Sequence, residues 1–395
     1  MTVDFKADVA VIGAGPAGST AAGLLAKRGL RVTLIDRDKF PRDKLCGEFL
    51  SYDALPILDL LGVTSSIDEA GAARIRTCRI IGSRRTVAFD LPVAARGISR
   101  LRLDEILLES ARTHGARILT GHAAEKVSGG GGARMIELTH EGARVTVEAS
   151  FVIGAWGRWG RLDRQMERSF VTETRERHFG FKKHYRRRSP GPDDTIDLYS
   201  FDSGYLGVSK VEDDLTNICG LVHGSRLKGN RGGWEGFVDR LAAENRSLGD
   251  LYRDHEPVQQ LFLSSEPVIF RSRSSAEQGM LLVGDAAGMI DPLTGNGMAM
   301  AIQSALLAST AVLRALGGDR ADAAADYRSR HSRLFGSRLR WSRSIASLLS
   351  RPHLLDTLLA TMPVRAIGPF LLRKTRSDRG ELDRAIRLWN DPVHN

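Results

Sequence analysis

A glycine-rich motif near the start of the chain has the residue types that bind a pyrophosphate. It reads Gly13, Ala14, Gly15, Pro16, Ala17 and Gly18. Gly13 allows a tight turn, Gly15 lets a pyrophosphate approach the backbone, and Gly18 lets a helix pack closely on a strand. The helix that follows would turn the free N–H groups of its N-terminus toward the phosphates.

An acidic residue follows at the end of the next β-branched run, as a dinucleotide fold requires. Asp36 ends the run 31–36, where its carboxylate can accept hydrogen bonds from ribose hydroxyls. Arg37, next to it, can flank an adenine ring. The glycine motif and Asp36 together predict a dinucleotide site, and they leave open whether the ligand is NAD or FAD.

A second motif lies much later in the chain and has the residue types of a sugar and ring contact. Gly284 and Asp285 follow a buried-strand pattern, and Asp285 can bind a sugar-like hydroxyl. The turn that follows presents backbone N–H groups at a helix start, which suits an electron-rich ring edge. This turn reads Asp291, Pro292, Leu293, Thr294, Gly295, Asn296, Gly297 and Met298. Two binding motifs so far apart predict a long ligand with two binding ends.

With both motifs, the chain resembles the FAD-dependent monooxygenase superfamily of the p-hydroxybenzoate hydroxylase type, in a branch close to geranylgeranyl reductases and flavin-dependent halogenases. Residues 100–107 also fit the family element R-x-x-L-D-x-x-L, and the resemblance covers at least residues 5–315. It implies FAD as the cofactor, Asp285 at the ribityl chain and Arg100 near the cofactor. The remaining cofactor contacts that it implies include Ala124, Gly284, Pro292, Gly295, Asn296, Gly297 and Met298.

The segment 41–51 resembles the Cys-Gly segment of geranylgeranyl reductases and the Gly-Glu-Ser segment of halogenases, both adjacent to the flavin. It contains Cys46, Gly47 and Glu48. We expect Cys46 and Gly47 to contact the cofactor, and we name Cys46 and Glu48 as candidate catalytic residues. Cys46 is either a chemically active thiol or a packing residue. Glu48 is an N-cap, a polar flavin contact or a general acid.

Two departures from the family pattern limit the assignment. Where the hydroxylases have the Asp of Gly-Ala-Asp-Gly, this chain has Trp156, so NAD(P)H as a direct electron donor is in doubt and a separate flavin reductase or other donor is allowed. Arg158 and Arg161 can still meet phosphate, or Trp156 and Trp159 simply pack at a domain seam. The halogenase signature W-x-W-x-I-P is missing, which disfavours halogenation.

The sequence therefore predicts an FAD-dependent oxidoreductase. We expect a monooxygenase that hydroxylates a bulky hydrophobic or aromatic, polyketide-like metabolite through a flavin C4a-hydroperoxide. The alternatives are an FAD-dependent reductase that saturates isoprenoid double bonds, a halogenase, and a flavin-binding assembly or regulatory protein without turnover. We expect no metal site and no hydrolase site, because the chain has neither H-E-x-x-H nor Gly-x-Ser-x-Gly.

The elements that position these residues follow from the hydrophobic pattern. Strands at 8–12 and 31–36 around a helix at 16–28 form a βαβ unit. Further helices are predicted at 101–114 and 298–315, and further strands at 116–120, 144–153 and 279–284. We predict an α/β fold with a Rossmann-type FAD-binding domain from residues 1–72, 100–165 and 271–326. We also predict an inserted antiparallel-sheet substrate domain from residues 73–99 and 166–270. A basic helical C-terminal region follows at 327–395.

The positive charge of the chain is concentrated in that C-terminal region. The formal net charge is +10, from 57 Lys and Arg against 47 Asp and Glu, and residues 328–388 carry the whole excess. Helical spacing places Leu334, Trp341, Ile345, Leu348 and Leu349 on one side, largely opposite Arg333, Arg340 and Arg343. The region is expected either to pack over the substrate domain with a solvated arginine face, or to bind a membrane or an acidic carrier protein that delivers the hydrophobic substrate. We expect no nucleic-acid partner.

The cysteines and the apolar stretches bear on the compartment. Cys46, Cys78 and Cys219 are too few and too widely spaced for a disulfide framework or a zinc site. Without a secretory signal, this predicts a cytoplasmic protein, with a peripheral position at the membrane left open. The uncharged stretches 9–26 and 292–313 contain Gly and Pro, and we expect them to be buried core and not membrane spans.

Overall fold

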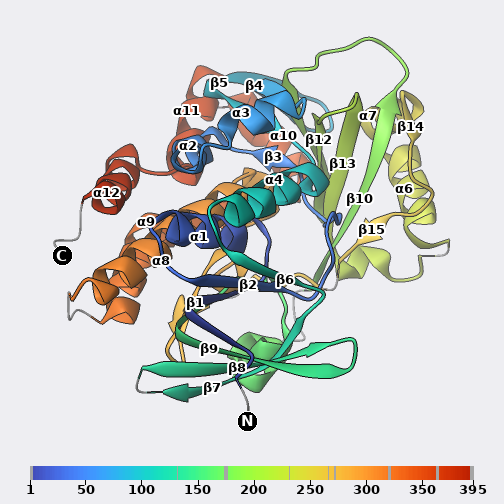
Figure 1. Ribbon diagram of the computed structural model, residues 1–395. Coiled ribbons are helices and arrows are strands. Elements are labelled where there is room, and N and C mark those ends of the chain that lie inside the picture. Colours follow the sequence, from blue (N-terminus) through green and yellow to red (C-terminus); the bar gives the residue numbers. More distant parts are fainter. Residues whose placement is uncertain are drawn as a thin grey trace.

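The computed structural model describes residues 3–130, 132–172, 177–230, 232–265, 267–270, 273–318, 322–361 and 364–391. Two β-sheets and their covering helices form the molecule, with one sheet at the base of Figure 1 and the other at its upper right. The observed α/β fold confirms the predicted fold class: a Rossmann-type sheet, a second sheet and a helical C-terminus.

The first sheet has a parallel core, as the β-branched runs predict. Its order is β17-β9-β1-β2-β6, and β1 lies between β2 and β9. Strands β7 and β8 extend it in antiparallel fashion from β9, and β16 pairs with β17. The strands are β1 Phe5–Ile12, β2 Val32–Asp36, β6 Arg117–Thr120, β7 Ala123–Gly130, β8 Ala133–His140, β9 Ala143–Gly154, β16 Ala276–Glu277 and β17 Met280–Leu282. Ligands of such sheets bind at the carboxyl ends of the strands, beside the first strand.

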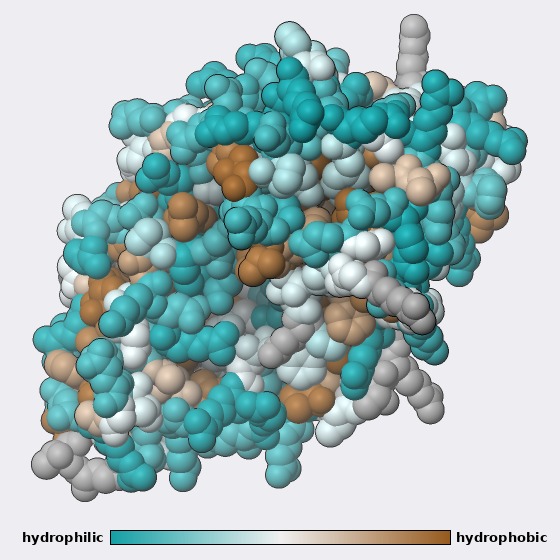
Figure 2. All heavy atoms as spheres, turned by 90° about the vertical axis from the view of Figure 1, so that its right-hand side faces the viewer, coloured by the Kyte–Doolittle hydropathy of each residue, from teal (hydrophilic) through white to brown (hydrophobic). Residues whose placement is uncertain are grey.

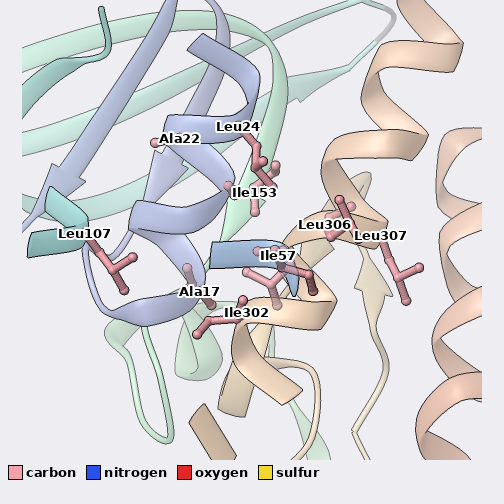
Figure 3. Packing of buried hydrophobic residues seen from close by; sticks show 14 of the residues in the cluster. Ala17, Ala22, Leu24, Ile57, Leu107, Ile153, Ile302, Leu306 and Leu307 are labelled. Carbon is pink, nitrogen blue, oxygen red and sulfur yellow. The ribbon is translucent and has the colours of Figure 1, made fainter. Parts of the chain in front are cut away.

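Three helices pack against this sheet and against one another, and the first and the last of them are rich in small residues. They are α1 Pro16–Lys27, α4 Arg100–Thr113 and α8 Gly297–Leu316. Figure 3 shows Ala17 of α1 close to Ile302 of α8, within one buried hydrophobic cluster. By length and composition α8 could cross a membrane, but 72% of its most apolar stretch is buried, so it is a core helix. Shorter helices are α2 Leu55–Leu61, α3 Thr64–Glu69 and α5 Arg161–Gln165.

The second sheet runs in the order β14-β10-β13-β12-β11-β4-β5-β3, and β15 pairs with β10. Its strands are β3 Phe49–Leu50, β4 Ala73–Ile81, β5 Thr86–Gly97, β10 His178–Arg187, β11 Thr195–Phe201, β12 Gly204–Lys210, β13 Leu215–His223, β14 His255–Pro257 and β15 Leu263–Ser264. All its pairs are antiparallel, as predicted, except β4 with β11. These two strands come from separate parts of the chain and meet edge to edge, so no hairpin turn imposes an antiparallel direction.

Two helices in this part of the chain were missed by the strand-like pattern. They are α6 Gly233–Glu244 and α7 Arg246–Arg253, which lie beside the second sheet in Figure 1. Phe237, Val238 and Leu241 of α6 are buried at helical spacing in one cluster with Phe181 and Leu206 of the sheet. That spacing was the signal that could have revealed α6.

The C-terminal region is helical, as predicted, and packs closely on the rest of the protein. Its helices are α9 Ala323–Leu349, α10 Pro352–Thr361, α11 Val364–Thr375 and α12 Arg379–Asn390. Helix α9 packs on α8, and α11 packs on α9 and β5. The prediction was wrong for Trp341, which is 37% exposed. Its ring meets the edge of the Phe370 ring at the rim of α11 and does not enter the core.

We predict that Gly18→Ala destabilises the protein by about 1–3 kcal/mol or more. A Cβ at position 18 would overlap the carbonyl oxygen of Gly13 and press on the Ala155 side chain, so α1 and the glycine turn would have to separate. Chemical denaturation measures the change in the free energy of unfolding. Gly130→Ala is the matched control, because a Cβ there meets open space. Equal stabilities of the two variants would contradict the tight packing of the turn.

Candidate active site

A cavity of about 1100 Å³ runs from the carboxyl ends of β1 and β2 to the second sheet and the C-terminal helices. Most of the residues predicted from the two motifs line it. They are Gly13, Gly15, Pro16, Ala17, Asp36, Arg37, Cys46, Gly47, Glu48, Arg100, Ala124, Gly284, Asp285, Pro292, Gly295, Gly297 and Met298. Ala14, Gly18 and Asn296 do not line it. Residues from distant parts of the sequence therefore meet at one site.

The glycine turn is held in place by Asp36. The Asp36 carboxylate accepts hydrogen bonds from the backbone N–H of Ala14 at 2.6 Å and of Asp38 at 2.8 Å. Gly13 has φ +108°, and a side chain there would overlap the carbonyl of Ala155. Gly15 is the N-cap of α1, so the open N-terminus of a twelve-residue helix faces the cavity. This geometry suits a pyrophosphate with a ribose beside Asp36.

The second motif supplies a carboxylate and a helix start at the other end. Within the described residues no hydrogen bond engages the Asp285 carboxylate, which lines the cavity and is available to a polyol. Asp291 caps the following turn by accepting from the N–H of Leu293, and Tyr205 Oη donates to it at 2.6 Å. Burial raises the pKa of Asp291 to about 6. Asn296 points away and donates to the carbonyl of Thr375, so the turn offers backbone groups at the start of α8.

Arg100 lies beside the glycine turn and lines the cavity. Its guanidinium binds both oxygens of Asp104, at 2.8 and 2.7 Å. Its Nη2 also lies next to the position that a Cβ on Gly15 would take. Asp104 further accepts from Arg42 at 3.0 Å, and the carboxylate thereby holds two guanidinium groups beside the nucleotide cradle.

Glu48 is the centre of a buried ionic cluster, which the sequence did not reveal. Its side chain is fully buried and its φ is +55°. Its Oε1 accepts from Lys182 Nζ at 2.6 Å and from the backbone N–H of Arg100 at 2.8 Å. Its Oε2 lies 2.6 Å from His184 Nε2, and Lys182 also donates to Asp43 at 2.8 Å. Both carboxylate oxygens are engaged, so Glu48 is placed to position neighbours and to support the start of α4, where Ser99 is the N-cap.

Cys46 lies between this cluster and the cavity. The Glu48 N–H donates to its Sγ at 3.4 Å, and Asn217 donates to its carbonyl oxygen at 3.1 Å. Burial raises the pKa of the Cys46 thiol, so the protonated form dominates at neutral pH. Cys78 and Cys219 line the same cavity, and burial raises the pKa of each to about 12. The sequence did not predict that Cys78 and Cys219 line the cavity, because only the packing of the second sheet over the site brings them there.

The two tryptophans are held by packing and by hydrogen bonds beside the cavity. The Trp156 ring fills the space beside Gly154 and Gly160, where any Cβ would collide with it. Its Nε1 donates to Asp163 at 3.0 Å. Trp159 donates to the carbonyl of Pro267 at 2.9 Å. Both rings also border the cavity, as do Arg158 and Arg161.

The basic C-terminal region contributes residues to the lining of the cavity. Ile345 and Leu349 of α9 and Leu371 and Leu372 of α11 line the cavity. They can do so because α9 packs on the core helix α8 and α11 bridges α9 and β5. The apolar sides of these helices form a wall of the cavity, while Arg333, Arg340 and Arg343 are exposed.

The residues present fit an FAD molecule. One end of the cavity has a glycine cradle, a helix N-terminus and Asp36, which match a pyrophosphate and an adenosine ribose. The other end has the free carboxylate of Asp285 and the start of α8, which match a ribityl chain and the electron-rich edge of a flavin ring. The cavity connects the two ends.

Comparisons with known proteins agree with this fit. Residues 6–193 match the family model of the FAD binding domain, and residues 260–331 match that of squalene epoxidase. The menaquinone reductase of Mycobacterium tuberculosis is 29% identical over 394 residues, covering 95% of this chain and 90% of the relative. The tryptophan 2-halogenase of Chondromyces crocatus is 28% identical over 369 residues, covering 88% of this chain and 68% of the relative.

The fold is also found among solved structures. A geranylgeranyl bacteriochlorophyll reductase-like protein from Thermoplasma acidophilum superposes with a TM-score of 0.76 at 22% identity, covering 98% of this chain and 99% of the other. The chain is thus similar along most of its length to proteins named as reductases and as halogenases.

We predict that Lys182→Met lowers the free energy of unfolding by about 3–5 kcal/mol, because it leaves the buried Glu48 carboxylate without its cation. The double variant Glu48→Gln/Lys182→Met should recover part of this loss. Arg112→Ala, which breaks the exposed pair with Glu109, is the control and should cost about 0–1 kcal/mol. Denaturant titration measures all three, and a Lys182 variant as stable as the control would contradict the cluster.

We predict that Cys46 reacts slowly with iodoacetamide at neutral pH, because its raised pKa keeps the thiolate scarce. The alkylation rate, followed by peptide mass spectrometry, should keep rising as the pH passes the ordinary cysteine pKa of 9.0. The unfolded chain is the control and should reach its plateau at lower pH. If the alkylation rate of the native protein reaches its plateau at a lower pH than that of the unfolded chain, Cys46 is a thiolate and the prediction is contradicted.

Proposed function

Because the chain is an enzyme of the FAD-dependent oxidoreductase superfamily, in the branch of the flavin-dependent halogenases and geranylgeranyl reductases, we propose that it is a monooxygenase. Its substrate would be a bulky, largely apolar or aromatic molecule such as a polyketide-like metabolite. The observation that carries the proposal is the cavity itself, which continues from the flavin motifs into an apolar chamber. The chamber is lined by Ile80, Phe89, Leu91, Ile196, Leu198, Leu349 and Leu371.

Bound FAD, once reduced, supplies the activation of O₂ and the transfer of one oxygen atom. The chain's own residues would bind the FAD and shield the reaction from water. Asp36 and the N-terminus of α1 hold the nucleotide half, and Asp285 holds the polyol. The start of α8 stabilises negative charge on the reduced ring. The apolar wall from the second sheet and α9 excludes water, which would otherwise consume the activated oxygen unproductively.

Electrons would come from a separate flavin reductase or another donor. Trp156 stands where the NAD(P)H-using hydroxylases of the resemblance have an Asp, and its ring is fixed between glycines and bonded to Asp163. NAD(P)H as the direct donor is the alternative, and rapid reduction of the holoenzyme by NADPH alone would support it.

A second candidate function is an FAD-dependent reductase that saturates an isoprenoid double bond. Saturation needs a proton donor beside the flavin, and the protonated thiol of Cys46 lies at that end of the cavity. The similarity to a menaquinone reductase over 95% of the chain also favours it.

Delivery of a water-insoluble substrate is the role we propose for the exposed side of the C-terminal helices. Arg333, Arg340 and Arg343 of α9 are exposed, and Trp341 lies among them. This surface would meet an anionic membrane or an acidic carrier protein, for a cytoplasmic enzyme that is peripheral at the membrane. The opposite molecular face in Figure 2 is mostly hydrophilic, and hydrophobic residues on it form only small, scattered patches.

We predict that the reduced holoenzyme incorporates ¹⁸O from ¹⁸O₂ into a long-chain alkylphenol, detected by mass spectrometry of the product. An isoprenoid quinone incubated without O₂ tests the alternative in parallel. Asp285→Ala, which removes the predicted ribityl contact, is the negative control and should lose bound FAD and turnover together. Hydrogenation of the quinone without O₂, and no labelled phenol, would reject the monooxygenase in favour of the reductase.

A further inference from the structure

Two arginines of the C-terminal region, the buried Arg338 and the half-buried Arg376, lie near the buried carboxylate of Asp53. Arg338 of α9 is 2% exposed; its guanidinium lies 3.9 Å from Asp53 Oδ2 and binds Gln303 Oε1 through two nitrogens at 3.2 Å. Asp53 Oδ2 also accepts from the hydroxyl of Ser377 at 2.8 Å. Arg376, next to Ser377, is the second arginine whose charge acts on Asp53.

Arg376 follows the end of α11, and its side chain contacts the turn that precedes α8. Its Nη1 donates to the carbonyl of Thr294 at 2.7 Å, and its guanidinium lies 5.8 Å from the centre of the Phe49 ring. Within the described residues its Nε is buried and has no hydrogen-bond partner. Arg376 borders the cavity, as does Cys78, whose thiol feels its charge. One nitrogen of the guanidinium is therefore bound, another has no partner among the described residues, and the residue borders the cavity.

The charge balance at this point is incomplete. Arg338, Arg376 and Asp53 leave one positive charge in excess. Among the described cavity-lining residues of the second sheet and the C-terminal helices, Arg376 is the sole charged side chain, and its neighbours there are apolar. A buried cation with an unsatisfied donor is costly unless a partner compensates it. A planar guanidinium is the side chain best suited to bind the oxygens of a carboxylate or phenolate.

We propose that Arg376 is a specificity-determining residue that binds an anionic oxygen of the substrate. The substrate is then an amphipathic organic anion. Its carboxylate or phenolate lies against Arg376 beside the Thr294 turn, and its apolar body extends along Leu349 and Leu371. This inference rests on the proposed function, because it names the substrate class that the same cavity accepts. It also gives the basic region a role inside the site.

The test compares two probes of equal chain length on the FAD-loaded enzyme. Decanoate and 1-decanol are titrated at mildly alkaline pH, and binding is read from the change in the flavin absorbance spectrum. We expect decanoate to bind about 10- to 100-fold more tightly than 1-decanol. Arg376→Gln, which removes the charge and keeps a polar side chain, should lose that preference and leave 1-decanol binding within about threefold. Arg373→Gln, on the exposed side of α11, is the matched control and should keep the preference.

Equal affinities of the parent enzyme for the two probes, or an Arg376→Gln variant that still prefers decanoate, would overturn the proposal. The Arg376→Lys variant provides a second test for the case that the Arg376→Gln variant does not retain FAD. It keeps the charge without the planar fork, so the preference should weaken and persist, and unchanged binding of both probes would again overturn the proposal. The measurement needs no turnover. A preference found in an enzyme that later proves to be a reductase would leave this inference intact while the monooxygenase proposal fails.

Discussion

The buried carboxylate of Glu48 is the interaction on which the site depends. A loop that follows β2 carries Glu48, whose two oxygens engage Lys182 and His184 of the second sheet and the first turn of α4. Since these partners belong to strand β10 and helix α4, and Glu48 itself to a third segment, the carboxylate fixes how the sheet sits over the nucleotide-binding end. Cys46 is two residues before Glu48, and a hydrogen bond from the Glu48 N–H to its Sγ helps to fix its position. A charge that cannot remain unpaired in the interior thus determines the geometry of the cavity.

The cavity has two chemically different ends because two different kinds of element build it. The parallel sheet contributes strand ends, helix N-termini and carboxylates, which suit a phosphate-bearing, polyhydroxylated ligand. The second sheet and helices α9 and α11 contribute aliphatic and aromatic side chains, which suit an apolar molecule and exclude water. The positive charge of the C-terminal region divides accordingly: Arg376 borders the cavity and Arg338 is buried against Gln303, while Arg333 and Arg340 face solvent.

The fold by itself does not select the reaction, because proteins named as reductases and as halogenases share it with this chain. Selection must come from a few side chains around the same cavity. The buried thiol of Cys46 borders the cavity, the fixed ring of Trp156 departs from the hydroxylase pattern, and Arg376 places a cation beside the apolar chamber. Each is a local change on a common scaffold, so related chains can differ in chemistry without a change in fold.

Much of the nucleotide-binding part could be predicted from the sequence, because its determinants are local. The glycine turn, the strand before it, helix α1 and Asp36 lie within one βαβ unit, and helix α8 follows its own motif directly. The sequence alone therefore determined the fold class, FAD and the cavity-lining residues of the two motifs. Only the tertiary structure decided the partners of Glu48, the cysteines that share the cavity, helix α6 and the inward turn of Arg376. Those contacts join residues far apart in the chain, such as Glu48 with Lys182, and no spacing in the sequence encodes a pairing made by the packing of two sheets.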